Sequence, residues 1–529
     1  MTNKLFYGDN LDVLRSEIAS ESVDLIYLDP PFNSNANYNI LFKSKTGDGA
    51  DAQIEAFEDT WHWNDHAEDA FDQVIRSGNT DAAELLRAMR GFLGENDMMA
   101  YLAMMAVRLI ELHRVLRPTG SLYLHCDPTA SHYLKLLLDG VFGAERFGNE
   151  ISWRRSNPKS LNSRNFANCR DVILRYTRTA GAIFNPIYGE HDPNYVESAY
   201  KYADSEGRRY RLLPLLNPND DRPNLTYEFL GVTRVWRWTR ERMQKAYEEG
   251  LVVQLKPGAV PQYKKYLDDS FGRTISNDWS DILPVAGNEV LGYPTQKPVA
   301  LLERIVSASS NEDDVVLDPF CGCGTAVHAA QKLGRQWIGI DVTHLAISLI
   351  EKRLKDAFPG ISFEVHGTPK DLASAEDLAQ RDKYQFQWWA VSMVDALPAG
   401  GKKKGADGGV DGIIYFKPDG KRTEKALVSV KGGGNVSVNM IRDLHSAMER
   451  EKAPIGVFIT AALPTRPMET EAAAVGRFED EWGRTYPKLQ IITLAELFQG
   501  KKPQIPYVDA RAGLKTAMKE DLTSQGTLL

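Results

Sequence analysis

The eight residues YLDPPFNS, at positions 27–34, follow a mostly apolar run at 23–26 and contain a carboxylate, two prolines and an aromatic ring. Pro30 and Pro31 end a strand, because proline lacks the N–H that a β-ladder needs. Asp29 and a proline carbonyl can each accept a hydrogen bond from an amino group, which turns the nitrogen lone pair toward an electrophile. Phe32 adds a flat face for a planar base. A simple turn with a capping acid explains the prolines but leaves the aromatic ring unexplained.

A second stretch, LDPFCGCGTA at 317–326, is suited to holding a nucleoside. The run 315–317 ends in Asp318, a loop with Gly322 and Gly324 follows, and the next apolar run ends in Asp341. Glycines let the backbone approach a ligand closely, and a carboxylate after the next strand can accept hydrogen bonds from ribose hydroxyls. The third glycine of the phosphate-binding version is missing, so a cofactor without phosphates fits better than NAD.

The segments around these two stretches alternate between strand and helix patterns, which indicates an α/β fold with a parallel sheet. Apolar residues recur at helical spacing over 98–116, and we expect that methionine-rich face to lie in the core. A chain of 529 residues should form two to four domains. We expect an α/β part at 1–150, an irregular or β-containing domain at 151–290, a second α/β part at 291–365, a linker at 366–384, a further domain at 385–510 and a loose tail at 511–529.

The composition, with 43% hydrophobic and 25% charged residues, is typical of a soluble globular protein. We expect no secretory signal and no membrane span, because no apolar run approaches the roughly 18 residues that a span needs. Four cysteines are too few for a disulfide scaffold of this size, which suits a reducing cytoplasm. The net charge is −8, yet residues 151–290 hold 21 Lys and Arg against 17 Asp and Glu. That segment could face a polyanion, although ordinary fluctuation explains the count equally well.

Four motifs together resemble the amino-group DNA methyltransferases that use S-adenosylmethionine. They are DPPF (29–32), YPTQKP (293–298), DPFCGCGT (318–325) and GRQWIGID (334–341). The order, with DPPF first and the glycine loop last, is similar to the circularly permuted β class, which includes modification subunits of type III restriction systems. The resemblance implies a Rossmann-like, doubly wound sheet with a target-recognition domain inserted at 151–290.

The resemblance also implies roles for individual residues. Catalysis would involve Asp29, Pro30, Pro31 and Phe32, and the cofactor would contact Asp9, Thr295, Gln296, Lys297, Asp318, Phe320, Gly322, Gly324, Thr325 and Asp341. DPPF, rather than SPPY, favours adenine N6 over cytosine N4 as the acceptor. Three alternatives stay open: a cytosine-N4 methyltransferase, an enzyme for protein or RNA amino groups, and a restriction nuclease that uses the methylase half for recognition. The basic middle segment argues against protein or RNA.

Double-stranded DNA is the expected partner, because a base must leave the duplex to be reached while the rest of the DNA is held. Arg154, Arg155, Lys159 and Arg164 could contact phosphates or base edges, although each could also lie on a solvated loop. Relatives in this class imply a homodimer and a restriction or helicase subunit as further partners.

The C-terminal stretches KKKGADGGVDGIIYF (402–416) and ALVSVKGG (426–433) resemble the Mrr-type restriction endonuclease domain of the PD-(D/E)XK fold. In such a site Asp411 would hold Mg²⁺ and Lys431 would help to activate water. Ser429 faces the same side of its strand as Lys431 but departs from the family, which has an acid or Gln there. Gln387 stands at a helix position that is often Glu. The domain could therefore be an active nuclease or a non-cleaving DNA-binding or regulatory module.

Overall fold

The protein is described by a computed structural model. It covers residues 2–31, 63–158, 164–291, 293, 295–396, 410–419, 422–506 and 520, together with the backbone of 37–42, 52–58 and 397–398. The described residues form two compact units: Pro186–Ser276 is one, and the segments before and after it make up the other.

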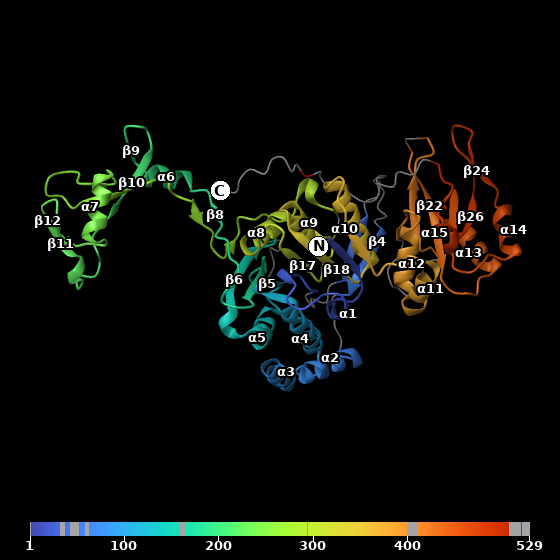
Figure 1. Cartoon of the computed structure of the whole chain (residues 1–529). Coiled ribbons are helices and arrows are strands. Elements are labelled where there is room, and N and C mark those ends of the chain that lie inside the picture. The colour runs from blue at the N-terminus through green and yellow to red at the C-terminus, as the bar shows by residue number, and fades with distance from the viewer. Residues whose placement is uncertain are drawn as a thin grey trace. The chain divides into compact units, whose positions relative to one another are not determined.

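A nine-stranded sheet forms the centre of the larger unit (Figure 1). Its order is β16 (Asp278–Trp279), β6 (Phe147–Arg154), β7 (Arg170–Thr177), β5 (Leu116–Cys126), β2 (Val23–Leu28), β17 (Val315–Asp318), β18 (Gln336–Asp341), β1 (Lys4–Tyr7) and β19 (Glu364–His366). The strands from β5 to β19 run parallel, and β7 is antiparallel to both of its neighbours. The predicted α/β sheet is thus confirmed, with one antiparallel strand, β7, third in the order.

Helices cover both faces of this sheet (Figure 1). On one side lie α1 (Asn10–Ser16), α4 (Asp97–Val115) and α5 (Ser131–Phe142), and on the other α8 (Val299–Ser309), α9 (Thr325–Lys332) and α10 (His344–Ala357). Two more helices, α2 (Asp65–Arg76) and α3 (Thr80–Leu93), pack on α4. This part also contains three smaller elements: η1 (Ala144–Arg146), η3 (Gly287–Glu289) and the hairpin of β3 (Asn37–Phe42) with β4 (Ala52–Glu58). The helix expected over 98–116 is confirmed, because Met99 and Met105 are buried in the core beside Leu28 and Leu124.

The smaller unit is mainly β-structure. A four-stranded sheet has the order β13 (Val252–Val253), β14 (Gln262–Tyr266), β10 (Arg209–Pro214) and β9 (Tyr202–Ala203). Two strand pairs accompany it, β11 (Thr226–Phe229) with β12 (Val232–Val235) and β8 (Tyr188–Gly189) with β15 (Arg273–Thr274). The helices of this unit are α6 (Pro193–Ala199), η2 (Pro223–Leu225) and α7 (Arg240–Glu248). Trp236, Met243 and Val252 form its core. The expected boundaries at 151 and 290 are wrong as bounds of a compact unit, because β6, β7 and β16 are paired into the large sheet.

A separate five-stranded sheet lies in the C-terminal part. Its order is β20 (Leu397–Pro398), β21 (Gly412–Phe416), β22 (Glu424–Lys431), β23 (Ile455–Thr460) and β26 (Leu489–Thr493), accompanied by α12 (Lys383–Ser392), α13 (Val438–Arg450), α14 (Arg466–Ala474), α15 (Leu494–Phe498) and the pair β24 (Arg477–Glu479)–β25 (Thr485–Pro487). The expected linker at 366–384 instead contains α11 (Leu372–Arg381), because Ala375 and Leu378 are buried in the core of this part and Asp371 and Ser374 form a capping box.

Two remaining expectations concern the tail and the membrane. Within 511–529 the structure describes Glu520, which pairs with His328 at 2.9 Å and Lys332 at 3.1 Å; the rest of the expected tail lies outside the described residues. Among the helices that are described, none combines the length and the apolar character needed to cross a membrane.

Candidate functional site

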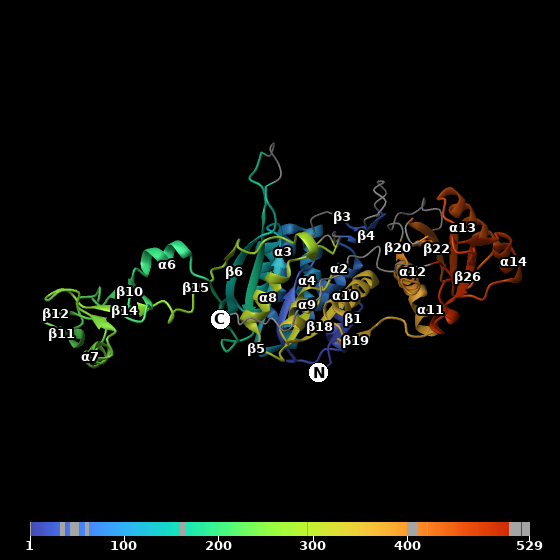
Figure 2. The same cartoon turned by 90° about the horizontal axis from the view of Figure 1, so that it is seen from above.

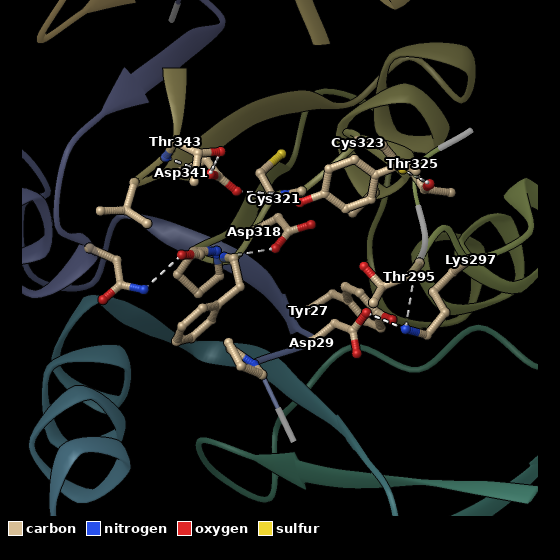
Figure 3. A pocket seen from close by; sticks show the side chains of 18 of the residues that line it. Tyr27, Asp29, Thr295, Lys297, Asp318, Cys321, Cys323, Thr325, Asp341 and Thr343 are labelled. Carbon is tan, nitrogen blue, oxygen red and sulfur yellow. Dashed lines mark hydrogen bonds and ion pairs between the residues drawn. The ribbon is translucent and has the colours of Figure 1, made fainter. Parts of the chain in front are cut away.

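A cavity of about 280 Å³ opens at the carboxyl ends of the parallel strands (Figure 3). Asp29 follows β2, Asp318 ends β17 and Asp341 ends β18, and all three line it. Parallel neighbours present their carboxyl ends at one edge of a sheet, which is where open α/β sheets bind ligands. The two motifs that the sequence singled out, although far apart along the chain, therefore share one cavity.

The Asp29 side of the cavity is built around an ion pair. Lys297 Nζ contacts Asp29 Oδ2, and the two side chains are 10% and 15% exposed. The same ammonium donates to the carbonyl oxygen of Thr295 at 3.3 Å. Pro31 also lines the cavity, Pro30 is buried beside it, and Phe32 lies outside the described residues. This ion pair holds the Asp29 carboxylate at the C-terminal end of β2, where it faces the cavity.

The other side of the cavity is formed by the glycine loop and Asp341. The N–H of Gly322 donates to Asp341 Oδ2 at 2.8 Å, and Thr343 donates to Oδ1 from both its N–H and its hydroxyl at 2.8 Å. Gly322 has φ +52°, and a Cβ added there would lie 3.3 Å from a ring carbon of Tyr293. This position therefore favours glycine for its backbone conformation, and a side chain there would also crowd Tyr293.

Burial strengthens the tendency of these acids to hold protons. Asp318 is 3% exposed, and its burial, with the negative charges of Asp29 and Asp341, raises its pKa well above the ordinary range. The N–H of Phe320, which donates to Asp318 at 3.1 Å, opposes this shift. Burial also raises the pKa of Asp341, against the donors on its oxygens. The cavity thus concentrates carboxyl oxygens that hydroxyl or amino groups of a ligand can reach.

The structure does not bring every expected cofactor residue to this cavity. Asp9, Thr295, Lys297, Asp318, Phe320, Gly322, Thr325 and Asp341 line it. Gln296 instead donates to the carbonyl oxygen of Glu289 at 2.6 Å and accepts from the N–H of Leu291 at 2.8 Å, so it holds its own loop. Gly324, with φ +75°, lies against α10, since an added Cβ would come within 2.8 Å of Ile350.

Sequence reasoning missed Arg108, a lining residue on α4 that is 4% exposed. Its guanidinium donates to Asp9 Oδ2 at 2.9 Å and to Asn10 Oδ1 at 2.6 Å. Asn10 in turn donates to the carbonyl oxygen of Pro319 at 2.8 Å, which ties the β1–α1 turn to the glycine loop. Burial lowers the pKa of Arg108, opposed by Asp9. The sequence offered one signal for Arg108: it is an arginine at a position where the helix pattern is otherwise apolar.

A buried chain of polar groups leads away from the cavity through Tyr27. The Tyr27 hydroxyl lies 2.9 Å from His125 Nδ1, His125 Nε2 lies 3.2 Å from Asp171, and Arg155 Nη1 lies 3.0 Å from the other Asp171 oxygen. Although burial opposes it, the hydrogen bond from His125 and the charges of Lys297 and Arg155 lower the pKa of Asp171. An ionised Asp171 only accepts hydrogen bonds, so His125 donates to it from Nε2.

The expected DNA-binding residues therefore have different surroundings. Arg155 is paired with Asp171, whereas Arg154 ends β6 and is half-buried, and Arg164 is exposed. Lys159 lies outside the described residues. The structure thus gives Arg155 a partner within the chain, which its sequence context did not reveal.

In the C-terminal sheet, Asp411 lies directly before β21 and is turned onto β22. Its Oδ2 accepts from the N–H of Val430 at 2.7 Å and from the Ser429 hydroxyl at 3.4 Å, and Lys431 Nζ lies 3.9 Å away. Burial raises the pKa of Asp411, opposed by Lys431. Ser429 and Lys431 thus face one side, as predicted. Gln387 is half-buried on α12, one turn after Lys383.

Within the described residues, no group of three or more His, Cys, Asp and Glu side chains is arranged to hold a metal ion. A carboxylate, a hydroxyl and an amide are weak ligands for Mg²⁺ compared with the two or more carboxylates that such sites commonly supply. The residues present around Asp411 therefore do not fit the metal site that the sequence suggested.

Two family models match the chain. Residues 23–352 match the N6/N4 DNA methylase model, and residues 399–499 match a model described as NACHT-associated inactive restriction endonuclease 1. The second description names an inactive endonuclease rather than the expected Mrr type.

Relatives and a solved structure each resemble about two thirds of the chain. The type II methyltransferase M.EcaI of Enterobacter cloacae is 31% identical over 360 residues, which are 67% of this chain and 69% of that protein. The StyLTI Mod subunit of the type III system of Salmonella typhimurium is 30% identical over 358 residues, 63% of this chain and half of that one. A DNA modification methylase structure from Thermus thermophilus, complexed with S-adenosyl-L-methionine, is 18% identical with a TM-score of 0.33 and covers 69% of this chain and 99% of its own. Because the methylase model alone spans more than half of the sequence, the chain belongs to the N6/N4 family of DNA methylases.

Proposed function

We propose that the chain transfers a methyl group from S-adenosylmethionine to adenine N6 in double-stranded DNA, at a specific sequence, as part of a restriction–modification system. The observation that carries the proposal is the single cavity shared by Asp29 and Asp341. The related M.EcaI and StyLTI Mod proteins are named as a type II methyltransferase and a type III restriction–modification subunit, which supports the setting.

The residues around the glycine loop fit a nucleoside cofactor. Asp341 and Asp318 offer oxygens to ribose hydroxyls or to the amino end of a cofactor, and Gly322 leaves space that a side chain would fill. Phe320 and Asp9 complete this side. S-adenosylmethionine, when bound, supplies a methyl group on a positively charged sulfur.

The residues after β2 would hold the acceptor base. Lys297 donates to Asp29 Oδ2, so we assign Asp29 Oδ1 as the acceptor of a hydrogen bond from the amino group of the base. The second amino hydrogen would go to a proline carbonyl of the Pro30-Pro31 pair. With both hydrogens fixed, the nitrogen lone pair points away from β2 and toward the cofactor side of the cavity, a near-attack arrangement.

Adenine is proposed over cytosine because the motif is DPPF rather than SPPY. Cytosine N4 is an exocyclic amino group of the same kind and could be held by the same two acceptors. It is therefore the second candidate.

The test is sequencing that detects modified bases in DNA from cells expressing the chain or its Asp29→Ala variant. We expect N6-methyladenine at one sequence motif with the unaltered chain and none with the variant. N4-methylcytosine instead would establish the second candidate. DNA without any modified base would overturn the proposal.

For the C-terminal part we propose a non-cleaving, DNA-binding module of PD-(D/E)XK type. The observation that favours this is Asp411, whose oxygen is taken up by Val430, Ser429 and Lys431. The match to a family described as inactive endonucleases agrees with it.

Nicking assays test this module. The full chain and its Ser429→Glu variant, which adds a carboxylate beside Asp411, are incubated with methylated and unmethylated plasmids in Mg²⁺ or Mn²⁺. We expect intact plasmid with the unaltered chain. Nicking that disappears in Asp411→Ala would overturn the proposal and establish the nuclease.

Further subunits are proposed from the relatives alone. The StyLTI Mod protein is named as a subunit of a type III enzyme, so a restriction or helicase subunit is a candidate partner here, and a homodimer is the candidate assembly. Light scattering on the purified chain would give its oligomeric state.

A further inference from the structure

The connection between β6 and β7 leaves the large sheet at the same edge as Asp29. Leu28 of β2 pairs with Leu124 of β5, and Cys126 of β5 pairs with Val172 near the start of β7. Since β7 is antiparallel to β5 and to β6, the connection from 155 to 169 starts and ends at the carboxyl edge of β2. Figure 2 shows the described flanks of this connection standing out from the sheet.

The root of this connection is close to the cavity. Two strand spacings separate β7 from β2, which is about 10 Å at the usual ~4.8 Å per strand. The polar chain from Arg155 through Asp171 and His125 to Tyr27 also crosses this distance. The connection is therefore anchored to a residue that lines the cavity beside Asp29.

Phe166 on this connection is fully exposed, at 101% of its reference area. Its neighbours in the chain, Arg164, Ala167 and Asn168, are exposed as well, so the ring adds nothing to a core. This large aromatic ring is left in water two residues from an arginine, on a connection that is rooted at the carboxyl edge of the sheet. It is therefore placed to meet a partner that is both planar and anionic. Nucleic acid bases and phosphates have this combination of properties.

We propose that Phe166 enters the base stack of duplex DNA at the place that the target base leaves, with Arg164 and Arg154 on the flanking phosphates. The inference rests on the proposed function and adds to it the residue that drives extrusion of the base. A base must leave the duplex to reach Asp29, and its departure breaks stacking. Apolar side chains inserted between base steps unstack them, and an aromatic ring restores part of the lost stacking.

The experiment compares two duplexes that carry the motif found by modified-base sequencing. In one, the target base is paired; in the other, it lies opposite an abasic site, so that extrusion costs less. Phe166→Ala should lower kcat/KM on the paired duplex by about tenfold or more, the range that loss of one aromatic–base stack gives. On the abasic duplex, kcat/KM of Phe166→Ala should approach that of the unaltered chain. Phe166→Trp should be active on both duplexes.

Two controls separate stacking from folding and from cofactor binding. Phe92→Ala removes another exposed phenylalanine, on α3, and should leave both rates unchanged. S-adenosylmethionine affinity should be the same in all variants. With 2-aminopurine as the target base, the fluorescence rise on binding should be smaller for Phe166→Ala than for the unaltered chain.

The rates also define what would overturn the inference. Equal activity of Phe166→Ala and the unaltered chain on the paired duplex would exclude insertion. An equal loss on both duplexes would assign Phe166 to a contact that does not drive extrusion. An unaltered chain that methylates neither duplex would overturn the proposed function itself, which is a different result.

Discussion

Asp29 and Asp411 are both carboxylates beside a lysine and next to a strand, Asp29 after β2 and Asp411 before β21, but the chain uses their oxygens differently. Asp29 opens onto a cavity that also holds Asp318 and Asp341. Asp411 is turned onto the neighbouring strand, where the N–H of Val430 and the Ser429 hydroxyl donate to it. A carboxylate acts on a ligand when its oxygens can be reached, so the same residue type is suited to chemistry in one region and to internal bonding in the other.

The two acids also differ in the number of other carboxylates that lie near them. Around the cavity that Asp29 lines, carboxylates from three strands converge at one edge. Around Asp411, the position two residues before the lysine is Ser429, so the second acid that a two-carboxylate metal site needs is absent there. Variants at both acids and around them test this contrast, and the largest effect is expected at Asp29.

Asp29→Ala should lower methyl transfer by about 100-fold or more, because removing one partner of a transition-state hydrogen bond typically costs that much. Asp411→Ala is the matched variant and should leave the rate unchanged. Incorporation of labelled methyl groups into DNA gives the rates, and calorimetry should show nearly unaltered S-adenosylmethionine affinity in both variants. Normal turnover of Asp29→Ala would remove Asp29 from the catalytic site.

Asp341→Ala and Gly322→Val should each weaken S-adenosylmethionine binding by about tenfold or more. The first removes a hydrogen-bond acceptor and leaves its partner on the cofactor unpaired, at a cost of ~1–3 kcal/mol, and the second places a side chain at φ +52° against Tyr293. Gly433→Val, in the loop after β22, is the matched control, because an added Cβ there meets nothing within 4 Å. Unchanged calorimetric affinity in both test variants would place the cofactor elsewhere.

Arg154→Ala should reduce the salt dependence of DNA binding by about 0.9 in the log–log slope, the value for one phosphate contact. Arg155→Ala should change the slope less, since its guanidinium is paired with Asp171. Binding titrations at several salt concentrations measure both. Equal slopes for Arg154→Ala and the unaltered chain would show that Arg154 makes no phosphate contact.

The smallest effect is expected from Asp411→Asn. Burial raises the pKa of Asp411 above its ordinary value of 3.8, so its contribution to stability is fully present below that pH and is lost as the pH rises through the folded-state pKa. Hydrogen exchange of peptides from β21 and β22 should therefore become faster with rising pH, relative to the variant, after correction for the intrinsic rate. A constant difference across the range would mean that Asp411 does not titrate as its burial implies.

Much of the architecture around the site could be predicted because its signals are local. Mostly apolar runs that end in an acid marked β2, β17 and β18, since strands buried on both faces are rich in apolar residues. Helical spacing marked α4 in the same way. Composition was a weaker guide, because the expected linker at 366–384 contains α11, whose few apolar residues lie in the C-terminal core.

The sequence by itself determined which strand ends carry acids, where glycine must stand and which motifs define the family. The tertiary structure decided which of these residues meet. It placed Arg108 on Asp9, Arg155 on Asp171, Gln296 within its own loop and Gly324 against α10. The physical reason is that strand and helix patterns arise from neighbours in the chain, whereas the use of a polar side chain depends on groups that folding brings to it from far along the sequence.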